Sequence, residues 1–194
     1  VGGYNLDYLP TKGQATDALP DDDTPWNLAY LICGSEGTLG LVLEAKVKLT
    51  PLPGATALCI VHFHDLIEAL RPVPAMLEHS PSAIELLDEI ILNEARLNAS
   101  SQSFAGFIEG DPKAVQIVEF FGDTPVEAAD RARGFAAQMK QQGTGYAQVV
   151  QTEASHIAGV WELRRLGVGL QSNVKGRSKP LDFVDDACVP VDKL

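Results

Sequence analysis

The chain has little cysteine and no long apolar run, and each shortage excludes a class of protein. Its three cysteines, Cys33, Cys59 and Cys188, are scattered through 194 residues without a CxxC spacing. They form neither a disulfide framework nor a metal or iron–sulfur cradle, so we expect reduced thiols in a cytoplasmic protein. No apolar run reaches the roughly 18 residues of a transmembrane helix, so we expect no membrane span.

Positive charge is also scarce. The chain has 15 Lys and Arg against 26 Asp and Glu, a net charge of −11. An acidic surface repels phosphate backbones and anionic lipid, so we expect no nucleic acid partner and no membrane-surface binding. An anionic substrate would need a local concentration of Arg or Lys. Otherwise the composition, 45% hydrophobic and 21% charged, is that of a globular protein.

The sequence divides at a proline- and glycine-rich junction. Residues 1–33 are loop-rich, and from Leu39 to Leu49 apolar and polar residues alternate, which predicts a strand buried on one face. Pro51-Leu52-Pro53-Gly54 ends this strand, because proline cannot donate to a ladder. We therefore expect two domains, residues 1–53 and 54–194. Since the chain opens at Val1 without Met or a signal-like segment, we also expect an internal fragment of a longer protein.

The second region has the pattern of an α+β domain. Strands are predicted over 56–63, 82–87, 114–121 and 146–150, and helices over 65–78, 88–98 and 125–142. Pro72 and Pro74 make the middle of helix 65–78 its weakest part, whereas Thr124-Pro125-Val126-Glu127 is a strong helix start. Without helix 88–98 the order is strand-helix-strand-strand-helix-strand, the ferredoxin-like split βαβ arrangement. Such a scaffold hosts many functions and indicates no particular chemistry.

The run Gly34-Ser35-Glu36-Gly37-Thr38-Leu39-Gly40 has the form GxxGxxG and leads into the first predicted strand. Close glycines let backbone N–H groups approach a pyrophosphate or ribose. It is neither a Walker A loop, because no Lys-Ser/Thr follows, nor a dinucleotide fingerprint, which would open a helix. By spacing alone, a tight turn before an edge strand explains the run equally well.

Its neighbours give the run a family context. Gly3-Tyr4-Asn5-Leu6-Asp7, then this run, then Lys48-Leu49-Thr50-Pro51-Leu52-Pro53 resemble the end of the FAD domain in the FAD-linked oxidases. This family includes D-lactate and D-2-hydroxyglutarate dehydrogenases and the glycolate oxidase flavin subunit. The resemblance implies an FAD-domain end at 1–53 and the N-terminal part of a substrate domain at 54–194. It also implies that FAD adenosine and pyrophosphate are lined by Gly34, Ser35, Glu36, Gly37, Gly40 and Leu41.

The resemblance continues over nearly the whole chain. Ser82–Asp88, Trp161-x-x-Arg164 and Asp185–Val191 resemble segments of the family's substrate domain. The best match is to the large bacterial subgroup in which the flavin module is fused to iron–sulfur modules. This implies iron–sulfur clusters elsewhere in the parent, and an electron acceptor reached through that module or a partner subunit. It places the parent in the cytoplasm or at the periphery of the inner membrane.

Arg164 is the strongest substrate candidate. It falls on one predicted helix face with Ile157, Val160, Trp161 and Val168. An arginine on such a face extends to its edge, forms a structural ion pair, or holds an anion in its planar fork. The resemblance implies that it binds the substrate carboxylate, with Lys179 as a second cation. Val168 stands where the family often has a threonine, which removes a polar contact.

Two further pairs have simple structural explanations. His62 and His64 share a strand face and could chelate a metal, but no further ligand lies at a suggestive spacing. Glu85 and Asp88 could form an acid–base pair, although solvated acids at a strand end and helix start explain them more simply. We therefore expect no metal site and assign no catalytic residue.

The resemblance implies that the parent oxidises a small 2-hydroxyacid by hydride transfer to FAD. The family's N-terminal pyrophosphate loop, its C-terminal His-x-His segment and its cysteine clusters are absent from this sequence. We therefore expect a fragment that folds, is inactive, and binds FAD weakly or not at all. The alternative is a non-catalytic ferredoxin-like binding or subunit-interaction module in which the glycine run is only a turn.

Overall fold

The computed structural model describes residues 3–6, 28–99, 101–172, 176 and 189–193. The chain divides into two compact units, Val1–Thr50 and Pro51–Leu194, which are described separately. No helix among the described residues is both long enough and apolar enough to cross a membrane.

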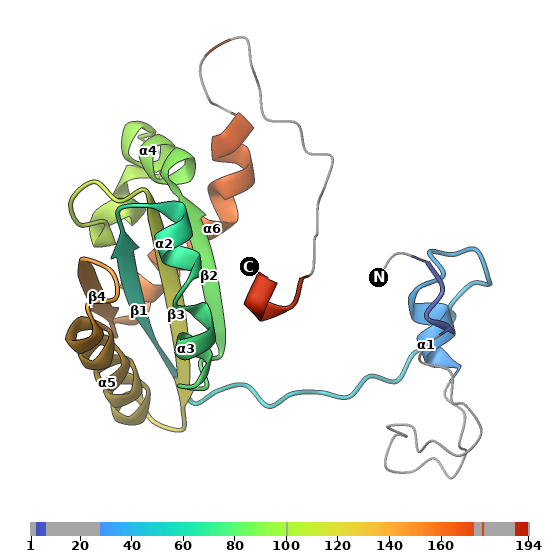
Figure 1. Cartoon of the computed structure of the whole chain (residues 1–194). Helices are drawn as coiled ribbons and strands as arrows, with labels where there is room; N and C mark the ends of the chain where they lie inside the picture. Colours follow the sequence, from blue (N-terminus) through green and yellow to red (C-terminus); the bar gives the residue numbers. More distant parts are fainter. Residues whose placement is uncertain (1–2, 7–27, 100, 173–175, 177–188, 194) are drawn as a thin grey trace. The chain divides into compact units, whose positions relative to one another are not determined.

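The second unit is built on a four-stranded antiparallel sheet with the order β2-β3-β1-β4 (Figure 1). The strands are β1 (Ala55–Phe63), β2 (Ala83–Asp88), β3 (Ala114–Gly122) and β4 (Ala147–Gln151). All four lie within one residue of their predicted bounds. The central strands β1 and β3 are buried on both faces because helices cover both sides, which explains their nearly continuous apolar sequences.

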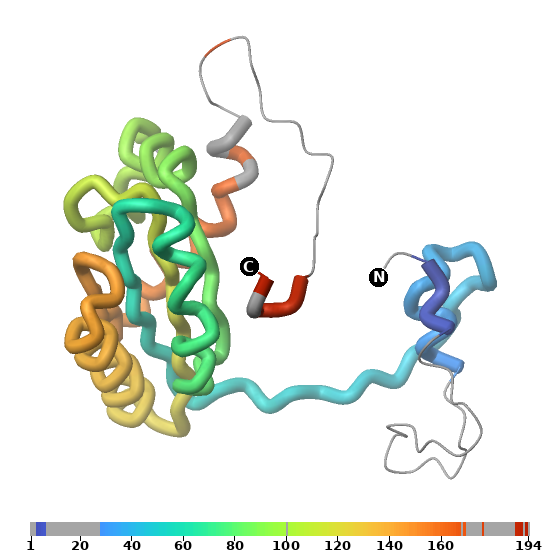
Figure 2. Tube along the Cα trace, in the orientation of Figure 1, coloured from blue at the N-terminus to red at the C-terminus, as the bar shows by residue number. Residues whose placement is uncertain are grey.

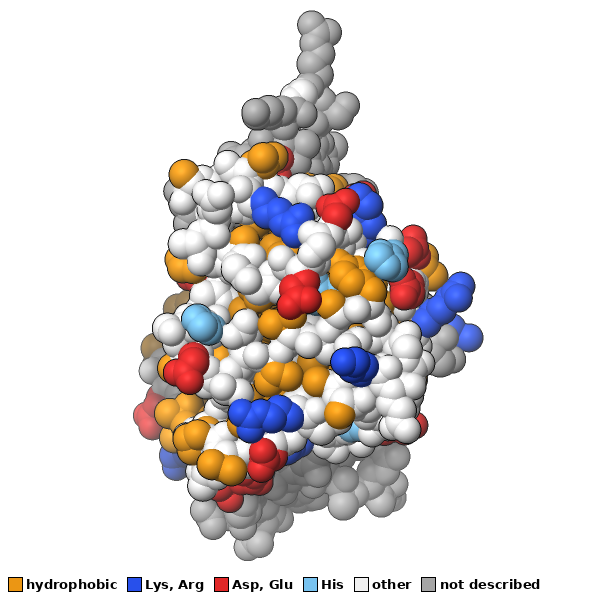
Figure 3. Space-filling view, turned by 90° about the vertical axis from the view of Figure 1, so that its left-hand side faces the viewer, with side chains coloured by type: hydrophobic (Ala, Val, Ile, Leu, Met, Phe, Trp, Pro, Cys, Tyr) orange, Lys and Arg blue, Asp and Glu red, His pale blue; other side chains and the backbone are white. Residues whose placement is uncertain are grey.

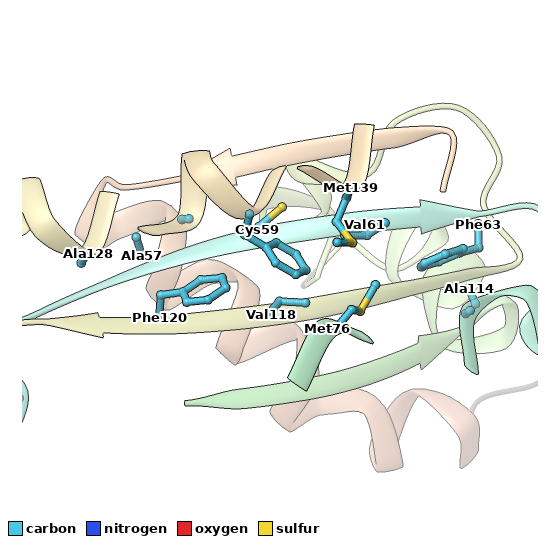
Figure 4. Packing of buried hydrophobic residues seen from close by; sticks show 13 residues of the cluster. Ala57, Cys59, Val61, Phe63, Met76, Ala114, Val118, Phe120, Ala128 and Met139 are labelled. Atoms are coloured by element: carbon cyan, nitrogen blue, oxygen red, sulfur yellow. The ribbon is translucent and has the colours of Figure 1, made fainter. Parts of the chain in front are cut away.

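One face of the sheet packs against α2 (Leu66–Leu70), α3 (Val73–Leu77) and α5 (Pro125–Gln142). Figure 2 traces these helices beside the sheet. Alternate side chains of β1 and β3 point toward them (Figure 4). This core includes Cys59, Phe63, Phe120, Phe135 and Met139, all at most 1% exposed.

The opposite face carries α4 (Glu89–Leu97), the 3-10 helix η2 (Gln102–Phe107) and α6 (Ala154–Ser172). The other set of strand residues, such as Leu58 and Ile117, packs there against Val160 and Leu163 of α6. This second core holds α6 against the sheet, so the packing determines which strands the side chains of α6 contact.

Local signals determine the ends of α5. The Thr124 hydroxyl accepts a hydrogen bond from the Glu127 N–H at 3.2 Å, and Glu127 Oε2 accepts one from the Asp123 N–H at 2.8 Å. Gly143, with φ of 68°, ends the helix in the left-handed conformation. The predicted helix start and end are both confirmed.

The single helix predicted over 65–78 is wrong, because the structure has α2 and α3 instead. Pro72 has no N–H to donate to the preceding turn, so α2 ends at Leu70. Pro72 is then the N-cap residue of α3, and Pro74 occupies its first turn, where no N–H donor is needed.

The first unit contains α1 (Ala29–Cys33) followed by the glycine run. The strand predicted from Leu39 to Leu49 is wrong for this structure, since residues 40–50 have no regular secondary structure. Its apolar side chains are exposed, with Leu41 at 91% and Leu43 at 95%. A strand needs a neighbour for its backbone hydrogen bonds, and the described part of the first unit contains no other strand.

Candidate functional site

The glycine loop, residues 34–40, folds into consecutive turns directly after α1. The N–H of Ser35 donates to the Ile32 carbonyl at 3.0 Å, and the N–H of Thr38 donates to the Ser35 carbonyl at 2.9 Å. Between them Glu36 and Gly37 have φ of 48° and 78°. Glycine adopts this left-handed conformation freely, whereas it is uncommon for a glutamate. The loop is thus held in a conformation that its sequence only partly favours.

Residues upstream in the sequence support this loop. A Cβ added to Gly34 would lie 2.4 Å from the Gly3 carbonyl oxygen, so only glycine fits there. The hydroxyls of Tyr4 and Thr38 are 2.8 Å apart. Because the Thr38 hydroxyl proton is already donated to the Ser35 carbonyl at 2.6 Å, Tyr4 is the donor of this pair. Two segments quoted for the family resemblance therefore pack together.

The six predicted FAD residues divide into supporting and accessible groups. The buried Ser35 side chain donates to the Ile32 carbonyl at 2.9 Å, and Gly34 packs internally, so both serve the fold of the loop. The other four are exposed: Glu36, Gly37, Gly40 and Leu41. Within the part of the chain that the structure describes, their N–H groups donate to no acceptor. Free N–H groups around left-handed residues suit phosphate oxygens, so this donor set fits part of an FAD site.

Arg164 lies on α6 at the edge strand β2. Its Nε donates to Oε2 of Glu85 at 2.8 Å, and the two side chains are 45% and 36% exposed. Glu85 lies two residues before the buried Leu87 on β2, so both side chains are on the same face of the sheet, the one that packs against α6. No other hydrogen bond joins the Arg164 guanidinium to a described residue. The structural ion pair is present, yet the two terminal nitrogens remain open.

Trp161, one turn earlier on α6, lies at a second glutamate. Burial raises the pKa of Glu119, and the Trp161 side chain, a hydrogen-bond donor to this carboxylate, lowers it in part. Glu119 pairs with Ala83 across β3 and β2, and Glu85 pairs with Ile117, so the two glutamates are diagonal neighbours on one face. Trp161 and Arg164 thus each lie against a carboxylate of the sheet.

The next arginine in α6 provides a contrast. Arg165 donates through Nε to Oε2 of Glu162 at 2.8 Å and through Nη2 to Oε1 of the same carboxylate at 2.5 Å. This bidentate contact holds the pKa of Glu162 below its ordinary value. Arg165 is therefore committed to a neighbour on its own helix, whereas Arg164 retains unused donors.

Other candidates have structural roles. His62 is fully buried, with Nε2 3.2 Å from the Phe107 oxygen and 3.2 Å from the Glu109 nitrogen, and burial lowers its pKa. His64 is exposed and stacks on Tyr146 with the ring centres 4.3 Å apart. Among the described residues no three His, Cys, Asp or Glu side chains are grouped so that they could hold a metal.

Asp88 and Lys179 complete the sequence-derived candidates. The Asp88 carboxylate caps α4 by accepting the Ile91 N–H at 3.0 Å, so it is committed to the helix. Lys179 lies outside the described residues. Glu119 was not predicted from the sequence, and Glu85 was predicted to have no part in binding. The signal for Glu119 was an acidic residue inside a mostly apolar strand.

Two further features of the described surface are candidates for an anion site. A pocket of about 320 Å³ between η2 and the start of α6 is lined by Phe104, Phe107 and neutral polar groups, with the exposed His156 at its edge. On the face shown in Figure 3, acidic and basic side chains are interspersed. Neither feature gathers the positive charge that an anionic ligand requires.

The chain resembles known proteins over most of its length. Residues 52–194 match the family described as FAD linked oxidases, C-terminal domain. D-2-hydroxyglutarate dehydrogenase of Pseudomonas putida is 33% identical over 199 residues, which cover 99% of this chain and 19% of that protein. The protein of the same name from Escherichia coli is 31% identical over 183 residues, which cover 90% of this chain and 18% of that protein.

Glycolate oxidase subunit GlcD of Bacillus subtilis is 28% identical over 193 residues, which cover 96% of this chain and 37% of that subunit. The chain therefore spans about a fifth of the length of the two dehydrogenases.

Proposed function

This chain belongs to the FAD-linked oxidases, as its glycine loop and Trp-x-x-Arg motif predicted, and we propose that it is part of a flavin-dependent 2-hydroxyacid dehydrogenase. The observation that carries the proposal is the exposed guanidinium of Arg164, whose two terminal nitrogens have no hydrogen-bond partner among the described residues. Every 2-hydroxyacid has a carboxylate, and a planar arginine fork binds a carboxylate bidentately. The names of the dehydrogenase relatives support a substrate of the D-2-hydroxyglutarate kind.

On this proposal the two units belong to different domains of the parent. Residues 54–194 form the N-terminal part of a ferredoxin-like substrate domain, and residues 1–53 end an FAD-binding domain. The strand order β2-β3-β1-β4 supports the ferredoxin-like assignment, as do the helices that follow β1 and β3. The edge position of β2 leaves the Glu85–Arg164 region accessible.

The glycine loop contributes to cofactor binding. The exposed N–H groups of Gly37, Gly40 and Leu41 would hold phosphate oxygens of FAD, and the Glu36 carboxylate suits a ribose hydroxyl. Ser35 and Gly34 keep the loop in shape. When bound, FAD accepts the hydride removed from C2 of the hydroxyacid.

The substrate-domain residues bind and orient the substrate. Arg164 holds the carboxylate and thereby restricts the orientation of the substrate and of its C2–H bond. This lowers the entropic part of the barrier. We assign Lys179 as a second cation on the same anion. The net negative charge of the chain, −11, makes such local positive charge necessary.

The carboxylate role is tested in the complete flavoenzyme that contains this chain. Dye-coupled oxidation of D- and L-2-hydroxyacids is measured for wild type, Arg164→Ala and the matched control Arg165→Ala. Loss of two charge-assisted hydrogen bonds should lower kcat/KM about 100-fold in Arg164→Ala. The control should stay within about twofold, because Nε and Nη2 of Arg165 are already held by Glu162 on the same helix. An unchanged kcat/KM in Arg164→Ala removes Arg164 from this role.

The cofactor role is tested through Gly40. No atom lies within 4 Å of a Cβ added there, so Gly40→Ala fits within the described chain. Reduced FAD content in purified Gly40→Ala, beside a normal content in Gly134→Ala, is expected if this backbone approaches the cofactor. The isolated 194-residue chain should hold FAD weakly or not at all. Stoichiometric yellow FAD on that chain contradicts this expectation.

A further inference from the structure

We infer that Glu85 is a positioning residue, which orients the Arg164 guanidinium so that its two terminal nitrogens face the substrate carboxylate. This inference rests on the proposed role of Arg164 and adds a residue to that site. From the sequence alone, Glu85 is expected to be a solvated acid at a strand end.

The contact geometry supports an orienting role. Glu85 contacts only Nε of Arg164, at 2.8 Å, and leaves the end of the fork unused. Because the guanidinium is planar and rigid, holding Nε restricts the directions of both terminal nitrogens. The opposite geometry occurs at Arg165, where Glu162 engages Nε and Nη2 together and so occupies one full side of the fork.

The backbone that carries Glu85 is well anchored. Glu85 lies in the antiparallel pairing of β2 with β3, opposite Ile117, and is followed two residues later by the buried Leu87. A side chain on a paired strand is held more firmly than one on a loop. A free arginine at an exposed helix position samples many rotamers, and a partner that restricts them lowers the entropy lost when substrate binds.

Glu85 could instead compete with the substrate for Arg164. The two roles predict opposite changes when Glu85 is removed: positioning predicts weaker substrate binding, and competition predicts tighter binding. The exposure of the pair, 45% and 36%, means that solvent screens the attraction, so the competitive cost is small. The single contact at Nε is also the one that a competitor for the terminal nitrogens would not make.

The experiment compares Glu85→Ala, Glu85→Gln and the control Glu162→Ala in the complete flavoenzyme. KM and kcat are measured for the preferred 2-hydroxyacid, and the Kd of the corresponding 2-oxoacid is measured from the change in flavin absorbance. Glu85→Ala should raise KM and Kd about fivefold, with kcat within about twofold. Glu85→Gln retains an acceptor oxygen for Nε and should recover part of the loss. Glu162→Ala should change neither constant.

A double-mutant cycle with Arg164→Ala identifies the cause. Adding Glu85→Ala to Arg164→Ala should change KM and Kd no further, because the group that Glu85 orients is gone. An unchanged or lower KM in Glu85→Ala overturns the inference, as does an equal loss in both backgrounds. If Glu85→Ala loses FAD or thermal stability, Glu85→Gln decides by the same criteria.

The cycle also separates this inference from the proposed function. If Arg164→Ala weakens 2-oxoacid binding and Glu85→Ala does not, only the role of Glu85 fails. If Arg164→Ala leaves both kcat/KM and Kd unchanged, the carboxylate role of Arg164 fails, and the role of Glu85 fails with it.

Discussion

Lowering the pH should destabilise the second unit of the chain through protonation of His62. This side chain is fully buried in β1, and its Nδ1 has no hydrogen-bond partner among the described residues. Its Nε2 lies 3.2 Å from both the Phe107 oxygen and the Glu109 nitrogen, so a neutral ring satisfies one of these groups. A protonated ring would direct an N–H at the Glu109 N–H and bury a charge. Burial therefore lowers the pKa of His62 below its ordinary value of 6.5, although backbone carbonyls and the Glu109 charge oppose the shift in part.

The sign and size of the effect follow from proton linkage. Well above pH 6.5 the ring is neutral in both states, and His62 causes no loss of stability. As the pH falls below this value, the unfolded chain takes up the proton first, so stability is lost until the pH reaches the folded pKa. At about pH 5.5 the largest possible loss, reached if the folded ring stays neutral, is RT ln(1 + 10), or about 1.4 kcal/mol.

Urea unfolding followed by circular dichroism at about pH 7.5 and about pH 5.5 measures this loss. The chain with His62→Asn should be less stable at both pH values but should lack the His62 share of the pH dependence. His64→Asn, which changes an exposed ring, should keep the full wild-type dependence. Equal pH dependence in wild type and His62→Asn would refute the reasoning.

Three further outcomes can be checked on the same chain. Arg131→Lys should lower the free energy of unfolding in urea by about 1–2 kcal/mol, because lysine cannot replace both hydrogen bonds of Arg131 to backbone carbonyls, at 2.6 and 2.8 Å. The control Arg133→Lys changes an exposed side chain and should alter this free energy by less than about 0.5 kcal/mol. Gly145→Ala should lower the free energy of unfolding by more than about 1 kcal/mol, since φ is +67° and the new Cβ would lie 2.5 Å from a buried side chain. Gly134→Ala, at an open helix position, should raise it by about 0.5–1 kcal/mol. Cys59, whose pKa burial raises to about 12, should resist alkylation in the native chain and react in urea, as peptide mass mapping would show.

The sequence was a good guide where each element carries its own signal. The strands β1 and β3 contain long apolar runs, and their burial on both faces explains why the predicted bounds differ by at most one residue. The start of α5 at Thr124 and its end at Gly143 depend on residues within one turn. The family assignment likewise rested on contiguous motifs.

Contacts between distant residues were harder to predict. Glu85 and Arg164 are 79 positions apart, and their meeting depends on how α6 packs over the edge of the sheet. The raised pKa of Glu119 depends in the same way on burial under α6, which no local pattern reports. Arg164 was identified from its motif, but the residue that holds it became visible only in three dimensions.

The segment from Leu39 to Leu49 has the alternating apolar pattern of a strand, although it forms no strand in this structure. Its leucines are exposed, as at Leu43 and at Leu49, which is 82% exposed. Burying each such side chain contributes about 1.5–3 kcal/mol, so their alternation has a stabilising use only against a covering surface. In the proposed parent, the sheet of the FAD-binding domain would supply that surface. Arg164 supports the same reasoning, because its two terminal nitrogens have no protein partner among the described residues, and the carboxylate of the proposed substrate would supply one.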